Sequence, residues 1–188
     1  MVYLNMIFSR KISRIKKIQL KNYDEEEFLE EEFSFLLTCL TQENSDGVYT
    51  AALLALIESS NKALDFLLEH YLTLQDHAQM LGIPMLACTD YVVCYIFLLK
   101  RLKESQSNDE IALIVLALSS THYYVVPLLV EELISDNQEY LKRLKIVFRQ
   151  MGFKQVFPYL MMRPEVPFES FFRDVFGDSA IDKIKQKT

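Results

Sequence analysis

The stretch that decides the fold is "DGVYTAALLALIESSNKALDFLLEH", residues 46–70. It opens on an Asp-Gly turn signal and continues into small and apolar residues. A polar group, Ser59, Ser60 and Asn61, then interrupts it, and such residues suit the end of one helix and the start of the next. Because an amphipathic pattern resumes after the interruption, we interpret residues 46–70 as a helical hairpin.

The composition of the whole chain also favours helices. Of its 188 residues, 51% are hydrophobic and 24% are charged, which is typical of a folded globular protein. It has only 4 glycines and 5 prolines, fewer turn formers than an all-β chain of this length would need. The length suffices for one ordinary domain with a sizeable core. We therefore predict an all-α protein.

Further helical segments follow the first hairpin, with short polar breaks between them. After an acidic block at 24–32 that begins an earlier helix, we expect helices over 48–58, 62–79, 84–104, 109–119, 122–135 and 137–151. Such short connections predict that neighbouring helices pack antiparallel. A last short helix is expected to cover the final apolar face with one aromatic side, formed by Phe168, Phe171, Phe172 and Phe176. We divide the chain into a basic amphipathic N-terminal segment (1–23), a helical repeat domain (24–162) and a C-terminal aromatic capping helix with its tail (163–188).

A step of 31 residues aligns four segments without gaps, beginning at Ser59, Asp90, Thr121 and Gly152. Apolar residues recur at the fifth position of each segment (Ala63, Cys94, Val125 and Val156) and at the ninth (Leu67, Leu98, Leu129 and Leu160). A two-helix unit cannot bury its apolar face alone, so it stacks on copies of itself and the same positions meet at every interface. The pattern predicts stacked antiparallel helical hairpins, an α-solenoid. An irregular helical bundle is the alternative, since leucine-rich helix ends can align by chance.

The hairpin at 46–70 resembles a degenerate ankyrin repeat. The matching positions are Asp46-Gly47 at the turn, Thr50 at the start of the Thr-Pro-Leu-His element, Ala55 in the inner helix and Leu67-Leu68 in the outer helix. His122 and Val125-Val126 resemble the second half of a later repeat, and the resemblance covers residues 30–162. The Thr-Pro-Leu-His element is not intact, and Ser59 stands where the family has glycine. The resemblance implies an ankyrin-like scaffold that binds other proteins.

In that frame, residues beside the turns are the candidates for contact with a partner. They are Asn44, Asp46, Tyr49, Asn108, Asp109, Asn137 and Tyr140. Tyr49 and Tyr140 are favoured because tyrosine often anchors interfaces. We expect a non-catalytic protein–protein interaction module, such as an adaptor, a regulatory subunit or an effector. Its apolar columns would hold the scaffold rigid while polar residues near the hairpin tips select the partner.

The sequence offers no motif for catalysis or metal binding. His70 and His77 are seven residues apart, which is about 10 Å along a helix and too far for one metal ion. His-Glu-x-x-His and glycine-rich phosphate-binding motifs are absent. Cys39, Cys88 and Cys94 form no Cys-x-x-Cys pair, and we interpret them as reduced, packed thiols. We therefore expect neither enzyme activity nor a metal or cofactor.

Net charge and hydropathy restrict which classes of partner and which cellular location we expect. The net charge of -6 argues against a general nucleic-acid binder, because neutralising phosphates requires clustered cations. No apolar run approaches the roughly 20 residues of a membrane span, and no cleavage site follows the N-terminus, so we expect no secretory signal. The predicted location is the cytoplasm, or the host cytoplasm if the source is a pathogen.

Two rival functions stay open. The first is a membrane-surface adaptor that uses residues 1–22, where six cations lie beside an apolar stripe of Leu4, Phe8, Ile12 and Ile15. The second is a helical-bundle enzyme or small-ligand carrier with an aromatic pocket between helices. Its candidate lining is Tyr91, Tyr95, His122, Tyr123 and Tyr124.

Overall fold

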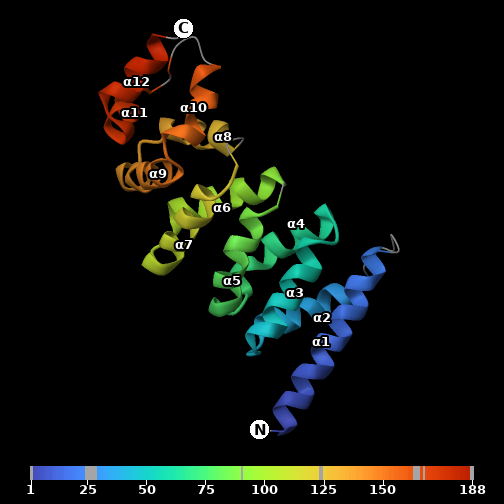
Figure 1. Ribbon diagram of the computed structural model, residues 1–188. Coiled ribbons are helices and arrows are strands. Elements are labelled where there is room, and N and C mark those ends of the chain that lie inside the picture. Colours follow the sequence, from blue (N-terminus) through green and yellow to red (C-terminus); the bar gives the residue numbers. More distant parts are fainter. Residues whose placement is uncertain are drawn as a thin grey trace. The chain divides into compact units, whose positions relative to one another are not determined.

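The chain is all-α over the residues that the computed structural model describes, namely 2–23, 29–89, 91–122, 125–162, 166 and 168–186 (Figure 1). Within these ranges every regular element is a helix, as the composition predicts. None of the described helices is both long enough and apolar enough to cross a membrane. The chain divides into two compact units, a first unit of residues 1–94 and a second unit of residues 95–188.

The first unit is built around α3 (Asp46–Ile57), which packs against its hairpin partner α4 (Asn61–His70) and against three further helices. These are α1 (Val2–Tyr23), α2 (Glu30–Thr41) and α5 (Asp76–Ala87), while α4 and the short 3-10 helix η1 (Tyr71–Thr73) connect α3 to α5 (Figure 1). The buried residues of α3 are Val48, Tyr49, Ala52, Leu53, Ala55 and Leu56, which leave little of its circumference polar. A helix that is apolar on most sides is a buried one, and this explains the central position of α3.

The hairpin predicted at 46–70 is confirmed as α3 and α4. The break between them lies at the expected serines, where the Ser60 hydroxyl accepts a hydrogen bond of 3.2 Å from the backbone N–H of Ala63. That bond satisfies one of the free donors in the first turn of α4.

Helices α3 and α5 run side by side in the same direction. Near their starts, the His77 imidazole lies 2.9 Å from the Asp46 carboxylate. Further along, a Cβ placed on Gly82 would lie 3.6 Å from the Leu53 side chain and 3.5 Å from the Tyr71 ring. Gly82 thus lies where α5 packs against α3 and η1, at distances that would leave an added Cβ in ordinary van der Waals contact.

The single helix predicted over 62–79 is wrong, because the chain turns after His70 and α5 begins only at Asp76. The cause is a tertiary contact with the end of α2. The backbone N–H of Gln75 donates to the Leu40 carbonyl at 2.9 Å, and the Gln75 side-chain amide donates to the Thr41 carbonyl at 2.7 Å. Carbonyl groups at a helix C-terminus lack intrahelical partners, and Gln75 supplies two donors to them.

The helix predicted over 84–104 is likewise two helices, since α5 ends at Ala87 and α6 (Val92–Glu104) begins four residues beyond Cys88. The Thr89 hydroxyl donates to the Leu86 carbonyl at 2.8 Å and so competes with the helical ladder at that point. Pro84, which the sequence places at the start of a helix, lies inside α5.

The second unit contains most of α6 and all the later helices. They are α7 (Asn108–Ser119), α8 (Val126–Glu131), the 3-10 helix η3 (Glu132–Ile134), α9 (Gln138–Met151), α10 (Phe153–Met161), α11 (Glu169–Phe176) and α12 (Asp178–Lys185). Helices α7 and α9 pack in parallel. Arg143 in α9 donates to the Ser105 carbonyl beside the start of α7 at 3.0 Å, and the Ser119 hydroxyl donates to the Gln150 side chain at the far ends at 3.0 Å.

The repeated apolar columns are confirmed as core positions. Ala63, Cys94, Val125 and Val156 at the fifth position have no exposed surface. Leu67, Leu98, Leu129 and Leu160 at the ninth position are at most 1% exposed. The 31-residue step therefore identifies residues with the same degree of burial in four successive segments.

The aromatic helix near the C-terminus is confirmed, with one correction. Phe172 of α11 is fully buried and meets the Phe148 ring of α9 at 5.3 Å between centroids. Phe168 does not share this side as predicted, because it lies before the helix in a left-handed conformation (φ 56°) and is exposed. Gly177, with φ 85°, ends α11 as the sequence predicts.

Candidate functional site

Two of the predicted contact residues build the turn between α2 and α3 instead of facing outward. The Asn44 side chain accepts a hydrogen bond from the Lys11 ammonium at 2.6 Å and donates to the Cys39 carbonyl at 2.8 Å. Tyr49 is only 3% exposed, and its hydroxyl donates to the Gln42 carbonyl at 3.1 Å while accepting from the Asn44 N–H at 3.0 Å. A tyrosine held in this way presents no aromatic face to a partner.

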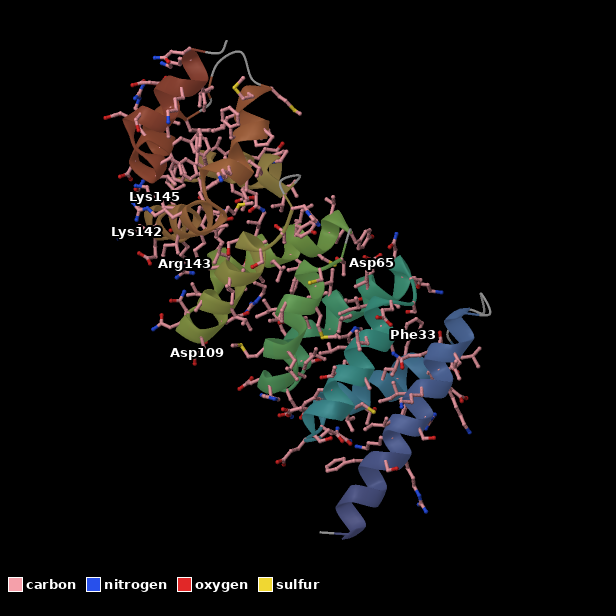
Figure 2. All side chains as sticks on the ribbon, viewed as in Figure 1. Phe33, Asp65, Asp109, Lys142, Arg143 and Lys145 are labelled. Atoms are coloured by element: carbon pink, nitrogen blue, oxygen red, sulfur yellow. The ribbon has the colours of Figure 1, made fainter. Side chains whose placement is uncertain are left out.

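Of the other five predicted contact residues, four are exposed and one is buried. Asp46, Asn108, Asp109 (labelled in Figure 2) and Asn137 are exposed at helix starts. The side chain of Asn137 caps α9 by accepting from the N–H of Tyr140 at 3.1 Å. Tyr140 is 1% exposed, and its hydroxyl has no hydrogen-bond partner among the described residues. Burial, and after it the Glu132 carboxylate, raises the pKa of Tyr140 far above its usual range. Tyr140 therefore belongs to the core, although the sequence favours it as an anchor.

Three of the five residues considered for an aromatic pocket, Tyr91, Tyr95 and His122, lie within the described part of the chain. Tyr95 is buried and His122 is exposed, while Tyr123 and Tyr124 lie outside the described residues. Tyr91 lines a cavity in the first unit.

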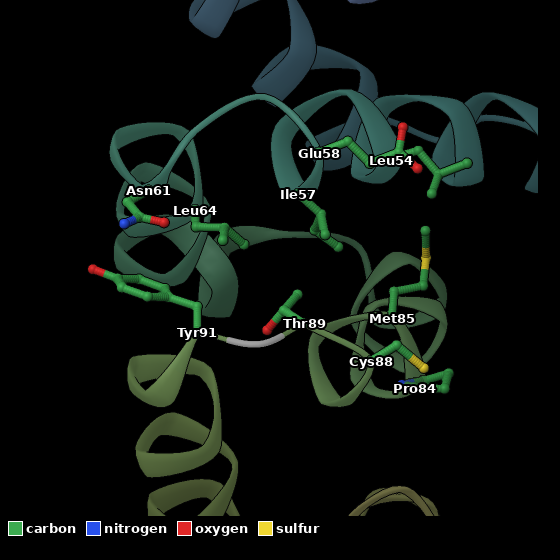
Figure 3. Close-up of a pocket in the computed structure, with 10 residues that line it drawn as sticks. All are labelled: Leu54, Ile57, Glu58, Asn61, Leu64, Pro84, Met85, Cys88, Thr89 and Tyr91. Atoms are coloured by element: carbon green, nitrogen blue, oxygen red, sulfur yellow. The ribbon is translucent and has the colours of Figure 1, made fainter. Parts of the chain in front are cut away.

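That cavity has a volume of about 760 Å³ and lies among α3, α4, α5 and the start of α6. Figure 3 shows Asn61, Leu64 and Tyr91 on one side and Pro84, Met85 and Cys88 on the other. Its remaining lining is Leu54, Ile57, Glu58 and Thr89. The wall is thus mainly aliphatic and carries a single carboxylate.

A second hollow, the α2–α4 groove, combines aromatic and acidic side chains. It has a volume of about 660 Å³ and is lined by Glu30, Phe33, Ser34 and Leu37 of α2 and by Lys62, Asp65, Phe66, Glu69 and His70 of α4. On each helix these residues recur at steps of three and four, so they form one stripe per helix and the two stripes face each other. Figure 2 labels Phe33 and Asp65, one from each wall.

The floor of the α2–α4 groove is aromatic. The ring centroids of Phe33 and Phe66 are 4.9 Å apart, and those of Phe66 and His70 are 4.4 Å apart. The Nδ1 atom of His70 lies 2.9 Å from the Phe66 carbonyl oxygen, a contact that fixes the imidazole against the helix. All three rings are half-buried, so they offer apolar surface to a ligand without needing to move.

The rim of the groove is acidic. Among its described lining residues, Glu30, Asp65 and Glu69 supply three carboxylates and Lys62 one ammonium, and all four side chains are exposed. Asp65 accepts a hydrogen bond of 3.3 Å from the Tyr91 hydroxyl, whose pKa is raised by partial burial and then by this carboxylate. Glu30 and Glu69 are exposed, and neither makes an ion pair with a described residue.

Glu69 stands at an unfavourable place for its own helix. It lies in the last turn of α4, where the helix dipole favours a cation over a carboxylate. The dipole and the carboxylate together make this end of the groove negative.

The basic helix α1 packs against the rest of the first unit through part of its apolar side. Ile15 and Ile18 are buried, and the Ile12 side chain lies 3.8 Å from where a Cβ on Gly47 would be. The Arg14 guanidinium sits 3.9 Å from the centroid of the Phe35 ring in α2. Of the predicted stripe, Ile15 is therefore in the core while Phe8 and Ile12 are half-buried, and the side chain of Leu4 lies outside the described residues.

Sequence reasoning does not find the α2–α4 groove. The three-and-four spacing on α4 is visible in the sequence but indicates only an amphipathic helix, and nothing local indicates that α2 lies opposite. No group of three or more side chains suited to a metal ion occurs among the described residues. Comparisons of the chain with protein-family models, with curated proteins and with solved structures found no match.

Proposed function

We propose that this protein is a non-catalytic protein-binding module whose α2–α4 groove receives a partner. The observation that carries the proposal is the groove itself, with an aromatic floor between two walls that bear exposed carboxylates. Aromatic rings in a hollow supply much of the energy of protein–protein binding, and charges around them select the partner. The module would act as an adaptor, a regulatory subunit or an effector in the cytoplasm.

We propose in addition that the hairpins stack as an ankyrin-like α-solenoid. Two contacts support this: Asp46 with His77 in the first unit and Ser119 with Gln150 in the second. Each pair is separated by the same 31 residues that align the apolar columns. In stacked arrays each repeat is held by its neighbours, so a groove wall is already ordered and binding costs less conformational entropy.

Site-specific photo-crosslinking tests the proposal. A photoreactive residue at Ser34, an exposed position on the groove wall, should yield a protein adduct of defined mass in cells that express the full chain. The same residue at Glu43, exposed in the α2–α3 turn, should not yield that adduct. A matched pattern of adducts from both positions, or no adduct from Ser34, would contradict a docking site in this groove.

A small-ligand carrier is the second candidate, favoured by the cavity of Figure 3. Its volume of about 760 Å³ lies in the usual range for ligand pockets, roughly 300–1,000 Å³. A thermal-shift screen against metabolites tests it. Stabilisation by a compound that Met85→Trp abolishes would support this function, because the indole would fill the cavity.

A further inference from the structure

We infer that the occupant of the α2–α4 groove is a cationic amphipathic segment of a partner protein, in which arginine or lysine residues flank a bulky apolar side chain. The inference rests on the proposed function, because it names the chemistry of the partner for the same groove.

The floor of the α2–α4 groove is suited to binding an apolar side chain of the partner. Phe33, Phe66 and Leu37 are half-buried, so an inserted aliphatic or aromatic side chain would remove apolar surface from water on both walls. The same rings attract guanidinium groups through their π faces. Lys62 to His70 spans eight helical steps, about 12 Å, which matches roughly two turns of a bound helix.

The first unit already contains one contact of this kind. Helix α1 is basic and amphipathic, and it packs with Ile15 and Ile18 buried while Arg14 lies over Phe35 of α2. The groove presents other residues of the same α2 helix, Phe33 and Leu37. A helix built like α1 therefore has the chemistry that the groove can accept.

The rim selects for positive charge. Glu30 stands on the α2 wall, and Asp65 and Glu69 stand on the α4 wall, so cations on both sides of the anchor would find a carboxylate. Glu69 adds its charge where the α4 dipole is already negative. The same field repels nucleic acid and anionic lipid, which excludes them as occupants.

A second copy of the chain is a poorer occupant than a separate protein. The exposed cations of α1, Arg10, Lys16 and Lys17, could approach the rim of another copy. The apolar side chains Ile15 and Ile18 of that helix are already buried within their own unit, so they are not free to enter the groove.

Selection from a phage library of random peptides of about 12 residues, long enough for roughly three helical turns, tests the inference on the full chain. Binders are counter-selected on Ser34→Trp, which blocks the groove at an exposed position without removing a buried side chain. We expect groove-dependent peptides with arginine or lysine on both sides of a leucine, phenylalanine or similar residue. Groove-dependent peptides that lack cations would overturn this inference and leave the proposed function standing. Selection of no groove-dependent peptide would overturn both.

Charge reversal tests the rim directly. Glu69→Lys should weaken binding of a selected peptide about fivefold, and the loss should shrink as salt is raised. Glu43→Lys makes the same change in net charge outside the groove and should alter affinity less than about twofold. Equal effects of the two variants would contradict recognition at the rim. A concentration-dependent dimer of the chain that Glu69→Lys disrupts would assign the groove to a second copy and overturn the inference.

Discussion

At the scale of single residues, Tyr49 and Tyr140 show that residue type alone does not predict which side chains are exposed. The sequence predicts both as surface anchors because tyrosine is frequent at interfaces, yet both are buried. Burial depends on which helix lies opposite, and neither turn chemistry nor spacing contains that information. The two hydroxyl groups differ, however, since Tyr49 makes two hydrogen bonds and Tyr140 makes none with a described residue.

Replacing each of these two tyrosines by phenylalanine gives a pair of variants that differ only in whether a hydrogen-bonded hydroxyl is lost. Tyr49→Phe should destabilise the protein by about 1–2 kcal/mol, because the Asn44 N–H and the Gln42 carbonyl lose their partner. Tyr140→Phe removes a buried hydroxyl that makes no hydrogen bond with a described residue and lies near the Glu132 carboxylate, so the free energy of unfolding should stay level or rise by up to about 1 kcal/mol. Urea denaturation of both variants measures the difference. A larger loss for Tyr140→Phe than for Tyr49→Phe would contradict this hydrogen-bond assignment.

A second prediction concerns the Glu110 carboxylate of α7. It is nearly buried and accepts hydrogen bonds of 2.9 Å from two nitrogens of Arg101 and of 2.5 Å from the Ser105 hydroxyl. Glu110→Ala leaves the guanidinium in a largely buried site without its partner, and should lower the free energy of unfolding by about 3 kcal/mol. The exposed Glu104→Ala should change it by less than about 0.5 kcal/mol. The two variants are compared by chemical denaturation. Equal decreases in the free energy of unfolding for Glu110→Ala and Glu104→Ala would refute the structural role of Glu110.

At the scale of helices, sequence patterns locate the elements but not all of their ends. The α3–α4 break is predictable because Ser60 is a local cap. The α4–α5 break is not, because Gln75 hydrogen-bonds to carbonyl groups of α2 more than 30 residues earlier. The α2–α4 groove escapes prediction for the same reason, since its walls are separated in sequence and only tertiary packing brings them together.

Helix α4 supplies a prediction in which stability and binding change in opposite directions. Glu69→Lys places a cation in the last turn of α4 and should stabilise the fold by about 0.5 kcal/mol. The same change should weaken binding in the groove, because it removes a rim carboxylate and adds a like charge to the basic segment. Thermal unfolding and peptide affinity measured on one variant check both halves. A variant that is both less stable and weaker in binding would instead indicate a structural role for Glu69.

The contact between α11 and α12 gives a prediction for pH. Arg173 donates to Glu169 at 2.8 Å and to Asp178 and Asp182 at 2.9 Å, and Lys185 also reaches Glu169. Hydrogen bonds from Lys185 and then Arg173 hold the pKa of Glu169 below its usual value. A lowered carboxyl pKa stabilises the folded state above the pKa of the unfolded chain, about 4.3, and this contribution disappears as the pH falls through the lower folded value.

We therefore expect α11 and α12 to loosen as the pH falls below about 4, because protonated Glu169 no longer pairs with the two cations. The methyl NMR signals of Ile181 and Ile184, both buried in α12, report this change locally. In Glu169→Gln the two signals should already be shifted at neutral pH and should depend less on acid. Identical titrations of the parent and the variant would contradict the pairing.

At the scale of the molecule, the chain consists of two compact units whose repeated positions share the same burial. The all-α class and the apolar columns are predictable because both follow from composition and periodicity. The partner surface is not, because it depends on exposed side chains that no periodicity constrains. We propose that the rigid hairpins of the first unit hold the walls of the α2–α4 groove for a basic segment of another protein.

Hydrogen–deuterium exchange of the full chain, with and without a bound partner or selected peptide, tests that proposal most directly. We expect slower exchange in α2 and α4, around residues 30–37 and 62–70, with little change around the cavity formed by Pro84, Met85 and Tyr91. Protection confined to that cavity, or to the second unit, would contradict it.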